Sequence, residues 1–191
     1  MRIFFLLILW LPVFSHAEVT TPWDLRQLMH NLAQVKESRA TFTEQKFLKI
    51  LKQPLESSGT LLYQAPDRLE KHTLVPKAES LVLHQGELTI DIKARNIKRT
   101  LVLQEYPAVW AFVESIRSTL AGDLPTLERF FKIELEGNSA AWKMKLLPVE
   151  SKTRKMVSEI SFVGNDNKVD SIDIIEANGD HSLMKVVEDT P

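Results

Sequence analysis

The sequence predicts an α+β fold in which one long, strongly curved antiparallel sheet carries helices over its concave face. Short segments rich in β-formers follow one another and are separated by tight turns, as in an antiparallel meander. Two stretches instead show apolar residues at helical spacing, one before the first strand and one near the middle of the chain. A sheet of about ten or eleven strands tends to curl, so we expect these two helices to cover its hollow side.

Residues 1–17 are predicted to be a signal peptide and not part of the fold. A short basic start is followed by an apolar run, Ile3 to Phe14, which is too short to span a bilayer as a helix. Ser15 and Ala17 place small residues at the two positions that a signal peptidase recognises, so we expect cleavage after Ala17. This small-residue ending disfavours the alternative of an uncleaved anchor. Residues 18–191 are expected to form a single domain.

The composition narrows the class of protein. The chain has no cysteine, so its core must hold it together without disulfides, and the lipid attachment typical of bacterial lipoproteins is excluded. Its formal net charge of −1 gives no basic excess, which argues against a nucleic-acid-binding protein. We therefore expect a monomer that is soluble in the periplasm and has no nucleic-acid partner.

The first helix is predicted over residues 21–38. Thr21 suits the N-cap and Pro22 the first helical position, and leucines recur behind them at helical spacing. Segments rich in β-branched and aromatic residues then predict strands. These strands are expected over residues 40–50, 57–64, 68–75, 79–92 as a hairpin with Gln85 and Gly86 at its tip, and 97–104.

A second helix is predicted to begin at Pro107, with Gly122 just after its last turn and Asp123 capping a short further helix. Strands then resume. In residues 131–137 and 142–147 apolar and charged residues alternate, so each strand has one buried and one wet face. Three more strands are expected between residues 155 and 187, joined by turns rich in Asn and Asp.

The sequence lacks the motifs of common enzymes. Its histidines outside the signal peptide are not spaced as a metal pair, and there is no G-x-S-x-G elbow, phosphate-binding loop or dinucleotide fingerprint. Glu134 and Glu136 alternate with core residues and are interpreted as a solvated face. A carboxylate pair from separate strands could still converge on a catalytic site. We predict a protein that is not an enzyme, with no catalytic residues, no cofactor and no metal.

Several stretches together resemble one family. "ATFTEQKF" is similar to an early strand of the outer-membrane lipoprotein carrier protein (LolA) superfamily, and "GTLLYQAPDRLEKHTLVP" to the hairpin that follows it. "ESLVLHQGELTID" resembles the next hairpin. "FKIELEG", "WKMKLLP" and "ISFVGNDNKVDSIDIIEANGDHSLMKV" resemble the C-terminal meander. The order and spacing of these motifs, with the signal peptide, identify the chain as a divergent LolA-like member.

The resemblance implies a half-open β-barrel closed by a helical lid. It also implies a carrier that holds the acyl chains of a lipid or lipoprotein and moves them from an inner-membrane donor transporter to an outer-membrane acceptor. Carriers of this family have an arginine just before the hairpin proline that helps hold the lid closed, and here that position is Ala65. This departure leaves the cargo open between lipoprotein, glycolipid and free acyl or polyene lipid. A lipid-sensing or interaction module of the same fold, with no transport role, is the alternative.

The candidate cavity residues are apolar positions of the predicted strands and of the helix that starts at Pro107. Trp110 is the leading candidate because an indole on the lid would gain from contact with an acyl chain. For each of these residues, the alternative interpretation is that the side chain packs in the hydrophobic core and does not face a cavity. The predicted cavity residues are Phe42, Leu61, Tyr63, Leu69, Leu81, Leu83, Leu101, Leu103, Trp110, Val113, Ile116, Phe162, Ile172 and Ile174.

Overall fold

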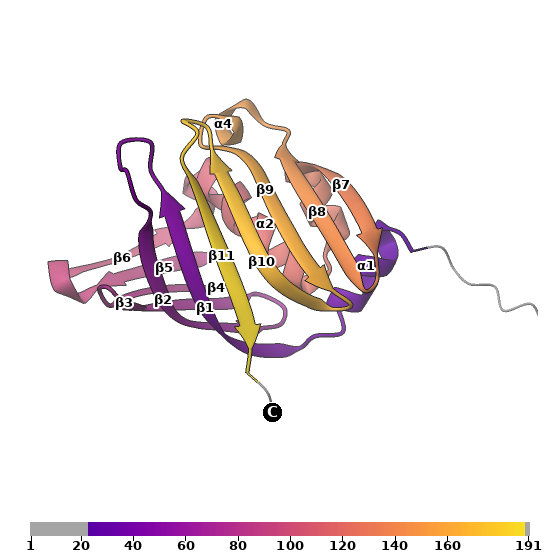
Figure 1. Ribbon diagram of the computed structural model, residues 1–191, viewed down its shortest axis with the longest axis horizontal. Coiled ribbons are helices and arrows are strands. Elements are labelled where there is room, and N and C mark those ends of the chain that lie inside the picture. Colours follow the sequence, from indigo (N-terminus) through magenta and orange to yellow (C-terminus); the bar gives the residue numbers. More distant parts are fainter. Residues whose placement is uncertain (1–22, 190–191) are drawn as a thin grey trace, which may run out of the picture.

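The computed structural model describes residues 23–189 as an α+β fold, which confirms the predicted class (Figure 1). Eleven strands form one antiparallel sheet in the order β6-β5-β4-β3-β2-β1-β11-β10-β9-β8-β7. The sheet curves strongly but stays unclosed, with β6 and β7 as its two edges. The predicted signal peptide and its cleavage after Ala17 lie outside the described residues.

The first and last strands meet in the middle of the sheet. β1 pairs with β2 on one side and with β11 on the other, so that Phe42 lies opposite both Gly59 and Val186. Every other pair joins strands that follow one another in sequence. The strands are β1 (Glu37–Phe47), β2 (Leu55–Gln64), β3 (Arg68–Val75), β4 (Glu79–His84), β5 (Glu87–Ile92), β6 (Ile97–Val102), β7 (Phe131–Asn138), β8 (Ala141–Pro148), β9 (Val157–Asn165), β10 (Lys168–Glu176) and β11 (His181–Glu188).

The predicted hairpin tips are confirmed. Gln85 and Gly86 connect β4 to β5 with φ angles of 52° and 77°. A two-residue hairpin connection of this kind needs positive φ at both positions, which glycine adopts at little cost. In β8 the side chains of Trp142, Met144 and Leu146 are buried while Lys143 is exposed, as the alternation predicted.

The helices are α1 (Leu25–Leu32), α2 (Pro107–Ala121), α3 (Leu124–Phe130) and a short α4 (Ser151–Arg154), with single 3₁₀ turns η1 (Lys93–Arg95) and η2 (Leu103–Glu105). α2 begins at Pro107 and is followed by Gly122 (φ 65°), and Asp123 accepts a hydrogen bond from the Thr126 backbone N–H, all as predicted. α4 was not predicted. Within residues 23–189, no helix combines the length and apolar character needed to cross a membrane.

The first helix is shorter than predicted. It starts after Asp24, whose side chain accepts from the Gln27 backbone N–H, and it ends at Leu32. Thr21 and Pro22, the predicted start, lie outside the described residues. From Glu37 onward the chain is already in β1, because pairing with two neighbouring strands outweighs the helical preference of this segment.

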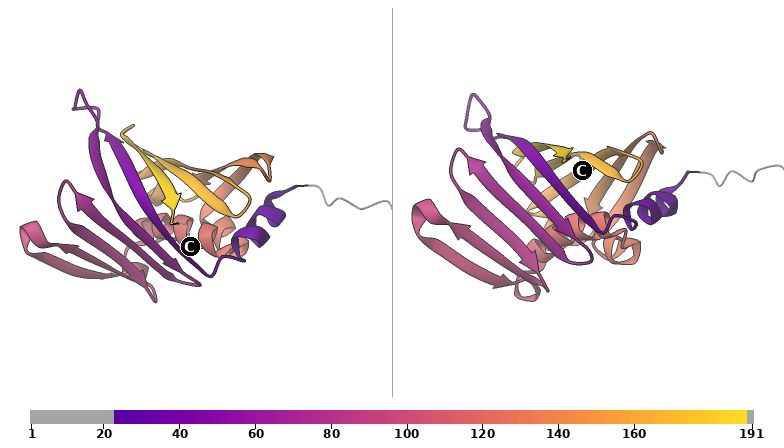
Figure 2. Two further views of the ribbon diagram at one scale, coloured as in Figure 1. Left: turned by 60° about the horizontal axis from the view of Figure 1, so that its bottom comes forward. Right: turned by 90° about the horizontal axis from the view of Figure 1, so that it is seen from below.

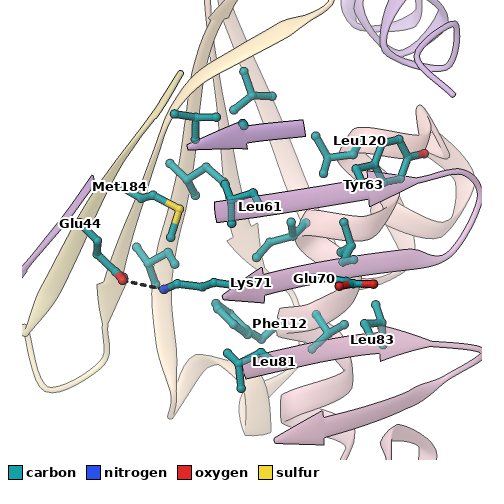
Figure 3. A pocket seen from close by; sticks show the side chains of 18 of the residues that line it. Glu44, Leu61, Tyr63, Glu70, Lys71, Leu81, Leu83, Phe112, Leu120 and Met184 are labelled. Atoms are coloured by element: carbon teal, nitrogen blue, oxygen red, sulfur yellow. Dashed lines mark hydrogen bonds and ion pairs between the residues drawn. The ribbon is translucent and has the colours of Figure 1, made fainter. Parts of the chain in front are cut away.

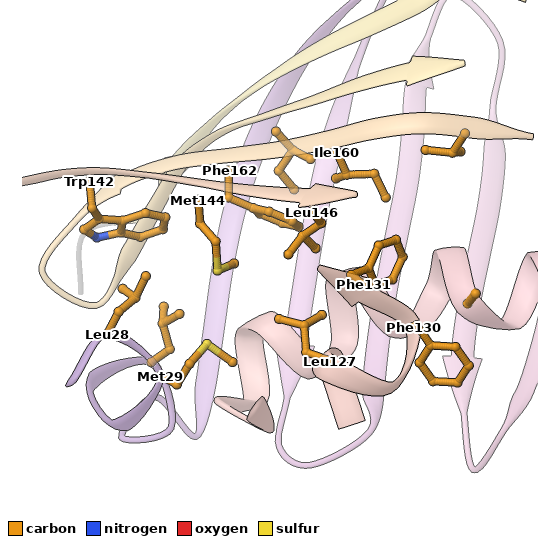
Figure 4. Close-up of a cluster of buried hydrophobic side chains, with 14 residues drawn as sticks. Leu28, Met29, Leu127, Phe130, Phe131, Trp142, Met144, Leu146, Ile160 and Phe162 are labelled. Atoms are coloured by element: carbon orange, nitrogen blue, oxygen red, sulfur yellow. The ribbon is translucent and has the colours of Figure 1, made fainter. Parts of the chain in front are cut away.

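The helices lie on the concave side of the sheet and divide it into two halves (Figure 2). Over β7–β10, side chains of α1 and α3 fill the hollow and form the main core with Trp142, Met144 and Phe162, which are at most 1% exposed (Figure 4). The half formed by β1–β5 is covered by α2 and holds fewer buried apolar side chains. Leu83, Leu103 and Val113 form a small cluster, and Ala40, Phe42 and Tyr63 are buried outside it. Space therefore remains between α2 and these strands.

Candidate functional site

A cavity of about 610 Å³ lies between α2 and the concave face of β1–β5, and extends to β10 and β11 (Figure 3). Strand register explains its wall, because residues directly opposite one another in a sheet point to the same face. One row crosses five strands and contains Ala40, Leu61, Lys71, Leu81 and Ile90. All five line the cavity. The row is apolar except for one lysine.

A second row lies beside the first. It contains Ser38, Tyr63, Leu69, Leu83 and Leu88, which are again directly opposite one another and again line the cavity. The roof comes from α2, whose apolar residues recur at spacings of three and four and so share one face of the helix. The α2 residues that line the cavity are Val109, Phe112, Val113, Ile116 and Leu120.

An ion pair interrupts the apolar wall. Lys71 Nζ lies 2.6 Å from Glu44 Oε2 (Figure 3). Glu44 also accepts hydrogen bonds from Ser182 (3.0 Å) and Ser57 (3.3 Å). Burial by itself would raise the pKa of Glu44, but the Lys71 ammonium and the three donors outweigh it, so the pKa lies below its ordinary value. Glu44 is therefore a carboxylate at neutral pH, and the pair is charged.

Further carboxylates of the cavity wall are also paired. Glu176 lies 2.9 Å from Lys46 Nζ, and Glu188 lies 3.4 Å from Lys168 Nζ. Since these charges are balanced by lysines on β1 and β10, they add no strong net field to the space they face. The cavity suits a largely apolar ligand.

One buried hydroxyl at the cavity has no partner. The Tyr63 side chain lines the cavity and is 4% exposed, yet its hydroxyl makes no hydrogen bond with any residue of the described part of the chain. Burial raises the pKa of this phenol, and the nearby Arg117 guanidinium opposes that effect only in part. Tyr63 is thus a neutral donor that could meet an oxygen atom of a ligand.

Most of the predicted cavity residues surround this space. Nine of the fourteen line it, and their role in binding stays a prediction. The nine are Leu61, Tyr63, Leu69, Leu81, Leu83, Val113, Ile116, Ile172 and Ile174.

The other five lie elsewhere. Phe162 is fully buried in the main core under α1 and α3, and Leu103 packs with Leu83 and Val113 behind the cavity. Phe42 points to the same side as the cavity wall but is 2% exposed, and Lys71 Nζ lies 4.8 Å from the centre of its ring. Leu101 belongs to the edge strand β6, beyond β5, the last strand that lines the cavity on this side.

The prediction that Trp110 faces the cavity is wrong. Its ring packs edge-on against Phe130 with 5.5 Å between ring centres, and its indole N–H donates to Glu114 at 3.3 Å. Each residue of a helix is rotated by about 100° from the one before it. Val109, Phe112 and Val113 therefore face the cavity, while Trp110 lies on the adjacent side of α2 and packs against the core.

Sequence reasoning also missed residues that the structure places at the cavity. Leu88 and Ile90 alternate in a predicted hairpin and could have been found by extending the wall across β5. Glu44 and Lys71 were missed for a different reason. A charged residue in a strand normally indicates a solvated position, and only the register shows that these two lie on the concave face.

An arginine joins α2 to the β2–β3 turn, but it lies on the helix and not in the turn, where the family resemblance would place it. Position 65 is alanine, but Arg117 of α2 donates from Nη1 to the Pro66 carbonyl oxygen (3.4 Å). The Arg117 guanidinium is held in place by Glu114 (2.7 Å) and Asp123 (3.0 Å). The contact between roof and wall is therefore made by a cation on the helix.

Comparisons with known proteins give a family match and several solved structures of similar shape. The family model described as outer membrane lipoprotein carrier protein LolA-like matches residues 17–186. A search of curated proteins finds no match. Among solved structures, a LolA superfamily protein from Nitrosomonas europaea is 8% identical, with 87% of this chain and 93% of that chain covered and a TM-score of 0.48.

Two further solved structures show a similar degree of likeness. A putative outer membrane lipoprotein-sorting protein domain from Vibrio parahaemolyticus is 7% identical, with 87% of this chain and 91% of that chain covered and a TM-score of 0.47. The MucA/MucB complex of Pseudomonas aeruginosa contains a chain that is 10% identical, with 85% of this chain and 55% of that chain covered and a TM-score of 0.46.

Proposed function

Because this chain belongs to the outer membrane lipoprotein carrier protein LolA-like family, we propose that it binds the acyl chains of a lipid or lipoprotein and carries them through the periplasm. The observation that carries the proposal is the apolar cavity between α2 and the β1–β5 half of the sheet. Apolar groups gain about 0.8 kcal/mol for each methylene that leaves water. An acyl chain would thus be held without a covalent bond or an ionic contact.

The size of the cavity agrees with such a ligand. A water molecule takes up about 30 Å³ in the liquid, similar to a methylene group, so 610 Å³ gives room for roughly twenty groups of this size. That is enough for one long acyl chain or for two short ones. The charged pair formed by Lys71 and Glu44 lies within the wall, so a bound chain would pass beside it.

Transport requires that the cargo can enter and leave. α2 forms the roof of the cavity, and its contact with the β2–β3 turn through Arg117 is a single hydrogen bond at 3.4 Å. We propose that α2 is the lid, that residues 1–17 are a signal peptide and that residues 18–191 form the binding domain. Donor and acceptor would be an inner-membrane transporter and an outer-membrane receptor for the same cargo.

Native mass spectrometry of the protein purified gently from periplasm tests binding, followed by lipid extraction and titration with a fluorescent fatty acid. We expect a co-purified species that carries at least one acyl chain. Leu81→Trp, which places a large side chain in the cavity, should abolish uptake of the fatty acid. Val82→Trp is the matched control, because Val82 points to the opposite face of β4.

The outcomes separate the candidate functions. Equal uptake by Leu81→Trp and Val82→Trp would place binding outside this cavity and contradict the proposal. A protein that contains no lipid and takes up no fatty acid would favour an interaction module of the same fold. Binding without transfer of the fatty acid to acceptor vesicles would favour a lipid sensor over a carrier.

A further inference from the structure

In the β1–β6 half of the sheet, one end of the strands combines exposed aliphatic and basic side chains. β1, β3 and β5 end there, and β2, β4 and β6 begin there, so three loops of this half lie along that end (Figures 1 and 2). The loops comprise residues 48–54, 76–78 and 93–96. We call them the edge loops. They are separate in sequence, and only the strand order brings them together.

The edge loops are basic, although the whole chain is nearly neutral. They contain five basic residues and no acidic residue, while the formal net charge of the chain is −1. None of the five forms an ion pair with another residue between positions 23 and 189, and all are exposed. One acidic side chain contacts the loops through a hydrogen bond: Asp180 accepts from the Lys49 backbone N–H at 2.9 Å. The five basic residues are Lys49, Lys52, Lys77, Lys93 and Arg95.

Large aliphatic side chains are exposed at the same place. Ile50 at the tip of the β1–β2 loop is 89% exposed, and Leu55 at the start of β2 is 52% exposed. Leu74 and Val75 at the end of β3 are 61% and 57% exposed. With Leu51, these residues make up half of the ten large apolar side chains that are exposed in the described part of the chain. Exposed apolar groups gathered beside unpaired cations mark an interaction surface.

We propose that the edge loops dock this protein on the surface of an anionic phospholipid bilayer. Aliphatic groups at loop tips can enter the interfacial region of a bilayer, and lysines beside them attract anionic headgroups. The cations are spread over three loops and do not converge on one point, which suits a diffuse negative surface. Ile50 protrudes and is not set in a recess, whereas anchor residues of protein interfaces usually lie in well-packed patches. The geometry thus favours a membrane over an acidic protein.

This proposal does not rest on acyl-chain binding. The edge loops lie at the ends of the strands and contribute no residue to the cavity wall. A protein with a blocked cavity should still dock, and a protein with altered edge loops should still take up a soluble fatty acid. The two proposals can therefore fail separately.

Co-sedimentation with vesicles tests the docking proposal. Wild-type protein should bind vesicles of equal parts phosphatidylglycerol and phosphatidylcholine, should bind pure phosphatidylcholine vesicles much more weakly, and should be released by salt. Each lysine near an anionic surface strengthens binding by roughly fivefold. The triple variant Lys52→Glu, Lys77→Glu, Lys93→Glu should therefore lose at least about a hundredfold in binding constant.

A matched variant controls for net charge. Arg26→Glu, Lys36→Glu, Lys143→Glu changes the charge by the same amount at exposed positions of α1, of the segment just before β1 and near the start of β8, toward the opposite end of the strands from the edge loops. It should keep most of the vesicle binding, and Ile50→Ser should weaken binding with no change in charge. Equal losses in the two triple variants would overturn the proposal. The proposal would also be overturned if the wild-type protein bound neither kind of vesicle. This outcome includes a protein that instead captures an acidic protein through the same lysines.

Discussion

Replacing Ala40 with leucine should shorten the acyl chain that the cavity can hold. Ala40 is 5% exposed, lines the cavity and lies in one row with Leu61, Lys71 and Leu81, so a larger side chain at this position extends into the space beneath α2. Leucine adds about three methylene-sized groups of roughly 30 Å³ each. About 90 Å³ of the 610 Å³ would be filled.

The loss of affinity follows from the groups that are displaced. Three methylenes left in water cost about 0.8 kcal/mol each, or about 2.4 kcal/mol in total, which corresponds to a roughly 50-fold weaker dissociation constant for a chain that fills the wild-type cavity. A chain shorter by three methylenes still fits the remaining space. Its affinity should change little.

The assay is isothermal titration with a series of saturated fatty acids of increasing length. For the wild-type protein, affinity should rise with each added methylene until the cavity is full. For Ala40→Leu the plateau should come about three methylenes earlier. The control is Thr41→Leu, which adds a leucine at the next position of β1, on the exposed face. Identical plateaus in a folded Ala40→Leu protein would refute the assignment of this wall to the ligand.

Three further predictions concern the polar groups around the cavity. Glu44→Gln should lower the free energy of unfolding by about 2 kcal/mol at pH 7, less than the 3–5 kcal/mol of a fully buried pair because the Lys71 side chain is 25% exposed. Since the folded-state pKa of Glu44 is lowered, its contribution is complete above the ordinary value of 4.5 and is lost as the pH falls through the lower pKa of the folded state. In a series of urea denaturations at decreasing pH, the difference between variant and wild type should therefore shrink progressively below pH 4.5. Tyr63→Phe removes a hydroxyl that has no hydrogen-bond partner among the described residues, so the midpoint of thermal unfolding should not fall. The affinity for a fatty acid should drop about tenfold if the hydroxyl donates to the ligand. An unchanged affinity would show that it does not. Arg117→Ala should speed the dissociation of a fluorescent fatty acid, measured by stopped flow, more than Arg117→Lys does. Equal dissociation rates in both variants and in the wild type would contradict the role of the Arg117–Pro66 hydrogen bond in holding α2.

Features set by short-range chemistry could be predicted from the sequence. Gln85 and Gly86 at a hairpin tip, Pro107 at the start of α2, Gly122 at its end and Asp123 as a cap all act on atoms within a few residues of themselves. Each was predicted and each is present. The order of the strands followed only in part: within each half of the sheet neighbouring strands are neighbours in the chain, as in a meander, but the pairing of β1 with β11, which leaves β6 and β7 as the edges, was not predicted.

The candidate site could be predicted only in part. An apolar residue in a strand can face a packed core or an empty cavity, and the sequence looks the same in both cases. Phe162 and Ile172 are directly opposite one another on the concave face and both belong to the main core, yet Ile172 also lines the cavity and Phe162 does not. Only the tertiary packing distinguishes the two positions.

The sequence by itself determined the class of fold, the succession of elements, and an apolar interior with no enzyme motif. Only the tertiary structure decided which half of the concave face is filled, that Trp110 turns toward the core, and that Glu44 meets Lys71. The reason is physical. Turns and caps depend on local backbone geometry, whereas the cavity depends on the register between β1, β2 and β11 and on the position of α2 above them, which are set by contacts between residues far apart in the chain.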